Sequence, residues 1–140
     1  GAFDAGQYEH ATNALVRVIE SAADIRARSE AECVLGQVFE KLSLQEATDT
    51  ARTAFQKLAM EHYLNVVYGS NLRDGESPDI QWVRFAGLRA LSLAETKQWW
   101  RQVAKLCTTV SDALPALKQQ LEKKRARAEE EAAKSVEELH

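Results

Sequence analysis

Apolar residues recur at alternating steps of three and four positions along most of this chain. An α-helix is the structure in which that spacing lines up on one face. The longest row is Leu93, Thr96, Trp100, Val103, Cys107, Val110, Leu114, Leu117 and Leu121. Shorter rows precede it at 8–25 and 44–62. The pattern predicts an all-α protein, built as an antiparallel bundle of about four to five helices.

Helix starts are predicted where a serine is followed three residues later by glutamate, because the two side chains can cap a first turn reciprocally. This pattern occurs at Ser29, Ser43 and Ser92. Ser77-Pro78 adds a fourth start, since proline fits the first turn of a helix. Gly69 suits a left-handed stop before a polar loop at 70–79. The last long helix is therefore expected to run on from Ser92.

The chain is expected to divide into a helical bundle domain, 1–117, and a charged extension, 118–140. The extension holds six Lys or Arg and six Asp or Glu. Lys124, Ala128 and Glu131 stand where the apolar row would continue, so the segment is expected to project as a coiled-coil-like helix or stalk. Pro115 lies just before it and either kinks the last helix or breaks it.

The charge balance bears on the kind of partner. The net charge of −3 at pH 7 is unlike the basic footprint of a nucleic-acid-binding protein, so no nucleic-acid partner is expected. No apolar run reaches the roughly 18–20 residues that span a bilayer, so no transmembrane segment is expected in this chain. The chain opens without a signal peptide, but a cleaved one would leave no trace. Cytoplasmic and secreted or cell-surface locations both stay open.

Cys33 and Cys107 are the two cysteines. They fit two buried thiols, which pack as small apolar side chains. They fit equally a single long-range disulfide in a secreted protein. Because a disulfide needs Cα atoms within about 7 Å, the sequence leaves the two alternatives open.

His62 is the one candidate for a cofactor-binding residue, because imidazole is a common metal and haem ligand. A helical di-metal site needs Glu-x-x-His pairs on two helices, and the sequence does not provide two. The favoured interpretation is a hydrogen-bonded histidine at the edge of the core. Neither a metal nor a cofactor is therefore expected.

Trp82, Phe85, Trp99 and Trp100 form the most informative group of side chains. Adjacent helical residues point about 100° apart, so Trp99 and Trp100 cannot face the same way. The simpler interpretation is that both are largely buried. The functional interpretation is an exposed aromatic anchor, because Trp and Arg dominate binding hot spots. On that interpretation the partner-binding residues are Trp99, Arg101, Trp82 and Arg89.

Catalytic motifs bear on whether the chain is an enzyme. The sequence has no phosphate-binding loop, nucleophile elbow or metalloprotease motif, so no catalytic residue is assigned. The leading hypothesis is a non-enzymatic helical module that assembles with itself or with a protein partner. One alternative is a secreted or surface ectodomain that binds a ligand or host protein, with a Cys33–Cys107 disulfide and the last helix as stalk. The other is a haem- or metal-binding bundle that uses His62.

Overall fold

The computed structural model describes residues 5–138, with side chains placed for 6–135. This part of the chain is all-helical, which confirms the predicted fold class. It contains six α-helices rather than the four or five expected. They are α1 (Ala5–Glu20), α2 (Ile25–Gln45), α3 (Asp49–Val67), α4 (Ile80–Thr96), α5 (Trp100–Ala113) and α6 (Lys118–Glu138), with a 3-10 turn at Pro115–Leu117.

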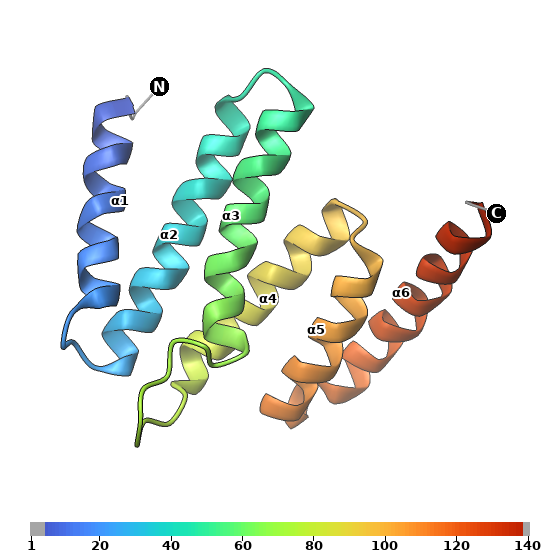
Figure 1. The fold of residues 1–140 in the computed structure, drawn as a ribbon. Coiled ribbons are helices and arrows are strands. Elements are labelled where there is room, and N and C mark those ends of the chain that lie inside the picture. Colours follow the sequence, from blue (N-terminus) through green and yellow to red (C-terminus); the bar gives the residue numbers. More distant parts are fainter. Residues whose placement is uncertain (1–4, 139–140) are drawn as a thin grey trace.

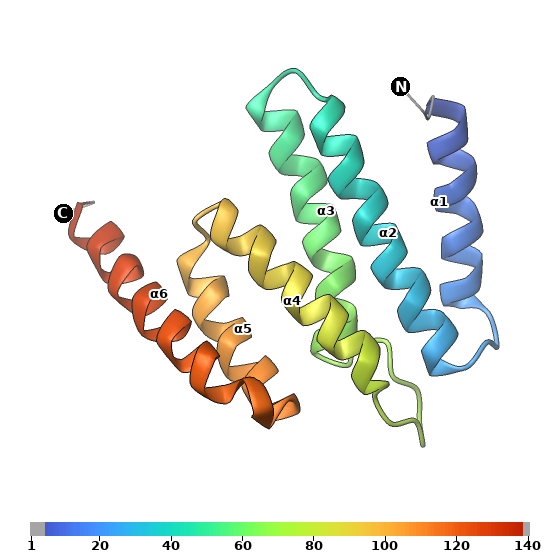
Figure 2. The same cartoon turned by 180° about the vertical axis from the view of Figure 1, so that it is seen from behind.

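The helices form an open array. Each helix packs mainly against its neighbours in sequence, and the one further substantial contact joins α2 to α4. In Figure 1, α1, α2 and α3 lie side by side, and α4, α5 and α6 continue the array. The view from behind in Figure 2 likewise places α1 and α6 at opposite ends. Arrays of this kind expose more helix surface than a closed bundle, which is how helical-repeat proteins obtain binding surfaces.

The hydrophobic core lies in the middle of the array, between α2, α3, α4 and α5. Its largest fully buried apolar side chains are Tyr63, Leu35, Leu106, Val103 and Val110. The half-buried rings of Trp82, Phe85, Trp99 and Trp100 pack against this core from outside. Both tryptophans of the adjacent pair are partly buried against the core.

The predicted capping boxes are wrong. Ser29 and Ser92 lie inside α2 and α4, and Ser43 lies in the last turn of α2. The hydroxyl of a serine inside a helix can donate to a carbonyl of the preceding turn instead of capping a helix. Ser43 donates in this way to the carbonyl of Glu40. Ser77-Pro78 does not begin a helix either, since α4 starts at Ile80.

The helices that do have side-chain caps begin after an aspartate or threonine that lacks the glutamate partner. Asp24 accepts from the amide of Ala27 at 2.9 Å. Thr48 and Asp79 cap α3 and α4 in the same way. A cap needs only one side-chain oxygen, so the two-residue pattern was too narrow a signal.

The long apolar row from Leu93 to Leu121 belongs to three helices, not one. Its first residues end α4, its middle lies in α5, and Leu121 lies in α6. The chain reverses twice, at Gln98 and again at the 3-10 turn that Pro115 begins. Pro115 therefore breaks the helix. Most residues of the row are buried or partly buried, since each of these helices packs against its neighbour in sequence, whereas Thr96 is exposed.

The segment 118–140 was expected to project as a stalk, which the structure does not confirm. α6 packs against α5, with Leu121 and Ala128 buried. Lys124 reaches back to Glu95 on α4, with 2.9 Å between Nζ and Oε1. The 118–140 boundary coincides with the start of α6. That this helix is a separate unit stays a prediction.

Ala128→Lys tests the packing of α6. Ala128 is fully buried, so a lysine there is expected to lower the free energy of unfolding by about 2 kcal/mol, or to detach α6 locally. Urea unfolding and amide hydrogen exchange along α6 measure the two effects. Ala126→Lys is the control, because Ala126 is exposed and its replacement should change stability by less than about 0.5 kcal/mol. Equal, small effects at both positions would mean that α6 projects freely.

None of the helices in the described part of the chain combines the length and apolar character required to cross a bilayer.

Candidate partner-binding site

A groove of about 530 Å³ lies where the α4–α5 turn meets the second half of α6. Trp99, Trp100 and Arg101 line one side of it, at the start of α5. Ala132 and Ser135 of α6 line the other. Two of the four predicted partner-binding residues, Trp99 and Arg101, therefore meet in one hollow.

The turn before Trp99 has the hydrogen bonds of a Schellman motif. The amide of Trp99 donates to the carbonyl of Ala94 at 2.9 Å, and the amide of Gln98 donates to Glu95 at 3.1 Å. Gln98 has φ of 58° and is the only non-glycine residue of the described chain with positive φ. This position usually holds glycine, which explains why the sequence pattern did not reveal the turn. Strained residues of this kind cluster at functional sites.

Gln98→Gly is expected to raise the free energy of unfolding by about 1 kcal/mol, because glycine adopts positive φ without the clash of a Cβ atom. Gln98→Ala is the control, since it shortens the side chain and keeps the strain. Thermal unfolding of the three proteins measures the difference. A glycine variant less stable than the wild type would show that the turn is not strained at this residue.

The start of α5 holds both tryptophans at the groove. Trp99 is the N-cap residue of α5, and within the described residues no side chain caps this helix. The ring of Trp100 packs beneath Arg127 of α6, with 5.7 Å from Cζ to the ring centroid. Arg101 is exposed beside them. Two partly buried indoles and Arg101 thus line the groove, and Arg127 lies over one of those indoles.

Trp82 and Arg89, the other predicted partner-binding residues, lie elsewhere. Trp82 is in the first turn of α4. The groove begins at the other end of this helix, about 20 Å away. The ring of Trp82 meets Phe85 edge-to-face at 5.4 Å. Arg89 lies over the ring of Phe85, with 5.9 Å from Cζ to the ring centroid, and pairs with Glu40 at 3.2 Å. The structure does not bring the four residues into one patch.

His62 lies at the edge of the core. Its Nδ1 is 2.8 Å from Oε2 of Glu32, and its ring stacks on Phe39 at 5.6 Å. The same carboxylate oxygen of Glu32 accepts from Asn65 at 3.2 Å. Within the described residues, no three His, Cys, Asp or Glu side chains gather as a metal site would require. These contacts match the hydrogen-bonded interpretation of His62.

Cys33 and Cys107 are both buried free thiols, so no disulfide joins α2 to α5 in this structure. Burial, with Glu32 and Glu30 nearby, raises the pKa of Cys33 to about 12. Burial also raises the pKa of Cys107. Both side chains are therefore protonated at neutral pH, and neither is placed to act as a nucleophile.

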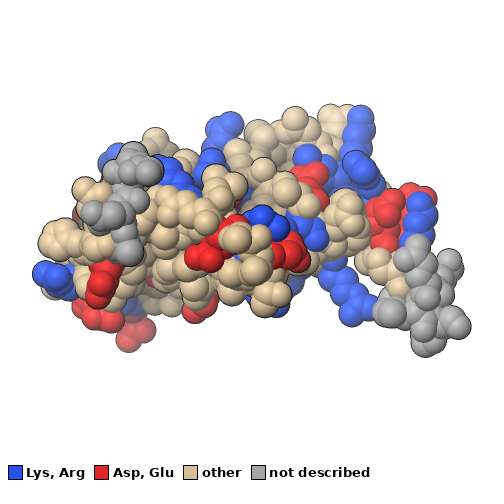
Figure 3. All heavy atoms as spheres, turned by 90° about the horizontal axis from the view of Figure 1, so that it is seen from above, with Lys and Arg blue, Asp and Glu red and all other residues tan. Residues whose placement is uncertain are grey.

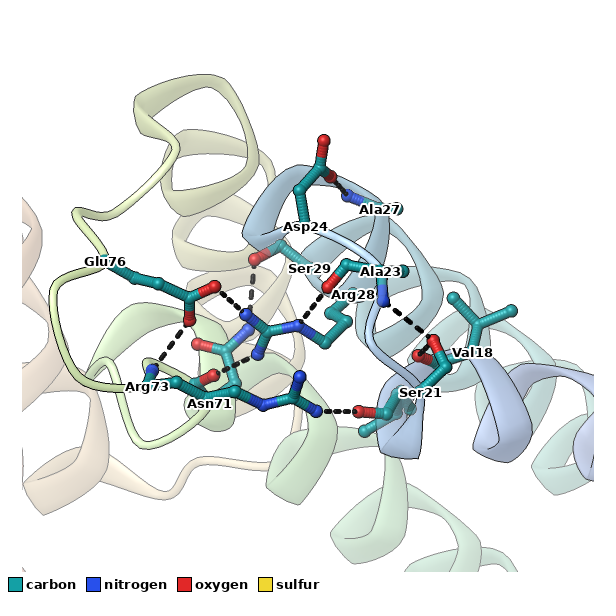
Figure 4. Close-up of polar contacts among 11 residues, drawn as sticks. Val18, Ser21, Ala23, Asp24, Ala27, Arg28, Ser29, Asn71, Arg73 and Glu76 are labelled. Atoms are coloured by element: carbon teal, nitrogen blue, oxygen red, sulfur yellow. Dashed lines mark hydrogen bonds and ion pairs between the residues drawn. The ribbon is translucent and has the colours of Figure 1, made fainter.

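Arg28 is a buried cation that no sequence pattern singled out (Figure 4). It is 2% exposed and forms an ion pair with Glu76 of the α3–α4 loop. Its guanidinium also donates to the carbonyls of Ala23, at 2.8 Å, and of Asn71, at 2.7 Å. Asn71 in turn donates to Ser29 at 3.0 Å. This network fastens the loop to the start of α2, so its role is structural.

Comparison with models of known protein families, with curated proteins and with solved structures finds no match to this chain. The groove itself is therefore the basis for a functional proposal.

Proposed function

We propose that this chain is a non-enzymatic helical module that binds a protein partner through the groove at Trp99. The observation that carries the proposal is the pair of half-buried indoles that line an open groove beside a strained turn. Tryptophan supplies a large rigid contact surface at little cost in side-chain entropy, and truncating it weakens interfaces more than truncating most residues does. The two tryptophans therefore have the chemistry of a binding anchor.

The open array supports the same proposal. Its end helices, α1 and α6, each have one principal neighbour, so their outer faces lie free within the described structure. Charges of both signs are interspersed over the face seen in Figure 3, which agrees with a net charge near zero. A strongly basic surface would instead have favoured nucleic acid. That nucleic acid is not the partner stays a prediction.

Selection from a displayed library of random peptides tests the proposal even though the natural partner is unidentified. Peptides of about a dozen residues are long enough to fill such a groove. We expect the wild-type protein to select peptides whose affinity falls about tenfold or more in Trp99→Ala, because interface tryptophans are typical hot spots. Fluorescence anisotropy of labelled peptides measures the loss.

Trp82→Ala is the matched control, because it truncates another half-buried tryptophan outside the groove. It should leave peptide affinity unchanged, and circular dichroism should show that both variants fold. If the selected peptides bind the two variants alike, or if selection yields none, the groove is not a partner site.

The two alternatives from the sequence have less support. The ectodomain hypothesis used a disulfide and a projecting stalk, whereas the cysteines are free and α6 packs on α5. The haem or metal hypothesis used His62, whose Nδ1 already contacts Glu32. Neither alternative is supported by an observation comparable to the groove at Trp99.

A further inference from the structure

The groove at Trp99 has an apolar interior and a cationic rim. Trp99, Trp100 and Ala132 supply the apolar surface. Arg101 lines the groove, and Arg127 lies over Trp100 at its α6 side. Both arginines are exposed, so each guanidinium is accessible to a ligand.

Neither arginine has an acidic partner among the side chains that the structure describes. Within residues 6–135, no carboxylate lies within ion-pair distance of Arg101 or Arg127, whereas Arg28, Arg89 and Arg125 each have one. Several acidic residues on nearby elements are instead paired with lysines. These pairs are Lys97–Asp49, Lys124–Glu95 and Lys134 with both Glu130 and Glu131. Among the side chains that the structure describes, the two arginines are therefore unpaired positive charges in a protein whose net charge is −3.

Complementary charge selects partners at an interface, because like charges placed together are strongly unfavourable. A basic segment would be repelled by the two arginines, and a purely apolar one would leave their charges without a partner. An indole beside a guanidinium also suits stacked nucleic-acid bases. However, single-stranded nucleic acid needs a groove whose cations follow several phosphates, and this rim offers two.

We infer that the partner of this groove is an acidic peptide segment with a large apolar side chain. The apolar side chain inserts between the indoles, and its acidic neighbours meet Arg101 and Arg127. Arginine is suited to this role because its planar fork can hold a carboxylate through two parallel hydrogen bonds. The inference rests on the proposed function, since it names the chemistry of the partner for the same groove.

The Trp99-dependent peptides from the display selection provide the test. We expect them to combine Asp or Glu with Phe, Trp, Leu or Ile, and to bind more weakly as salt is raised. The double variant Arg101→Gln/Arg127→Gln should lower their affinity about tenfold. Arg84→Gln, at an exposed arginine on α4, should leave it unchanged. Arg127→Lys should bind more tightly than Arg127→Gln and more weakly than the wild type, because lysine keeps the charge but not the planar fork.

Peptides resynthesised with Asn and Gln in place of Asp and Glu complete the cycle. Their affinity for the wild type should be as low as the affinity of the original acidic peptides for the double variant. Their affinity for the double variant should be no lower still. Neutral or basic peptides that still need Trp99 would overturn the inference and leave the proposed function standing. A deoxyuridine oligonucleotide that bound Trp99-dependently and more tightly than any peptide would overturn both. Peptides whose affinity does not depend on Trp99 would overturn the proposed function, and the inference that rests on it.

Discussion

Gly36→Ala is expected to destabilise the protein by about 3 kcal/mol, or to prevent it from folding. A Cβ atom at Gly36 would lie 2.5 Å from Cε1 and 2.7 Å from Cζ of Tyr63, well inside van der Waals contact. The ring cannot move away easily, since Tyr63 is fully buried and its hydroxyl donates to Glu40. Burial and that hydrogen bond also raise the pKa of Tyr63.

The direction of the change in stability distinguishes this close contact from the usual effect of alanine on a helix. Alanine in place of glycine inside a helix ordinarily stabilises it by about 1 kcal/mol. Urea unfolding followed by circular dichroism measures the change in free energy. The double variant Gly36→Ala/Tyr63→Leu should lose less than the sum of its two single variants, because removal of the ring relieves the clash. A stable Gly36→Ala protein would show that α2 and α3 do not pack this closely.

Arg28→Met is expected to lower the free energy of unfolding by about 2–3 kcal/mol. Methionine keeps much of the buried apolar stem but leaves the carbonyls of Ala23 and Asn71 without their donor. It also removes the ion pair that holds Glu76. Arg26→Met is the control, because Arg26 is exposed on the same helix. Equal stability of the two variants would contradict a structural role for the Arg28 network.

The effect of Arg28→Met should depend on pH. The hydrogen bond from Arg28, with the amide of Arg73, lowers the pKa of Glu76 below its usual 4.5. A lowered carboxyl pKa contributes stability above the unfolded-state value, and that contribution is lost as the pH falls through the folded-state value. The difference between wild type and variant should therefore be largest at neutral pH and shrink below about pH 4.5. Part of it should persist in acid, since the bonds to Ala23 and Asn71 do not titrate.

The sequence predicted the helical fold because the three-four spacing of apolar residues is a local property of each helix. The helix ends were harder to predict. Gln98 adopts a conformation that glycine usually occupies, in the turn between two helices that pack against each other. Ala128 appeared unable to continue an apolar row, yet a small residue is what allows α6 to lie close to α5. Neither fact is visible before the helices are placed together.

The site was predictable in part for a similar reason. Trp99 and Arg101 are close together in sequence, so their association needed no tertiary information. Arg127 lies on a different helix, and only the reversal at Pro115 brings it over Trp100. Trp82 and Arg89 were grouped with them by residue type, although Trp82 lies at the far end of α4 from the groove and Arg89 lies near its middle. Arg28 was missed because its partners come from a loop far along the chain.

The three indole N–H signals of the ¹⁵N-labelled protein test the partner site most directly. Each tryptophan gives one signal, so Trp82 is an internal reference outside the groove. On titration with a selected peptide, the signals of Trp99 and Trp100 should shift together while that of Trp82 stays in place. A peptide that binds and moves only the Trp82 signal, or none of the three, would contradict a binding groove at Trp99.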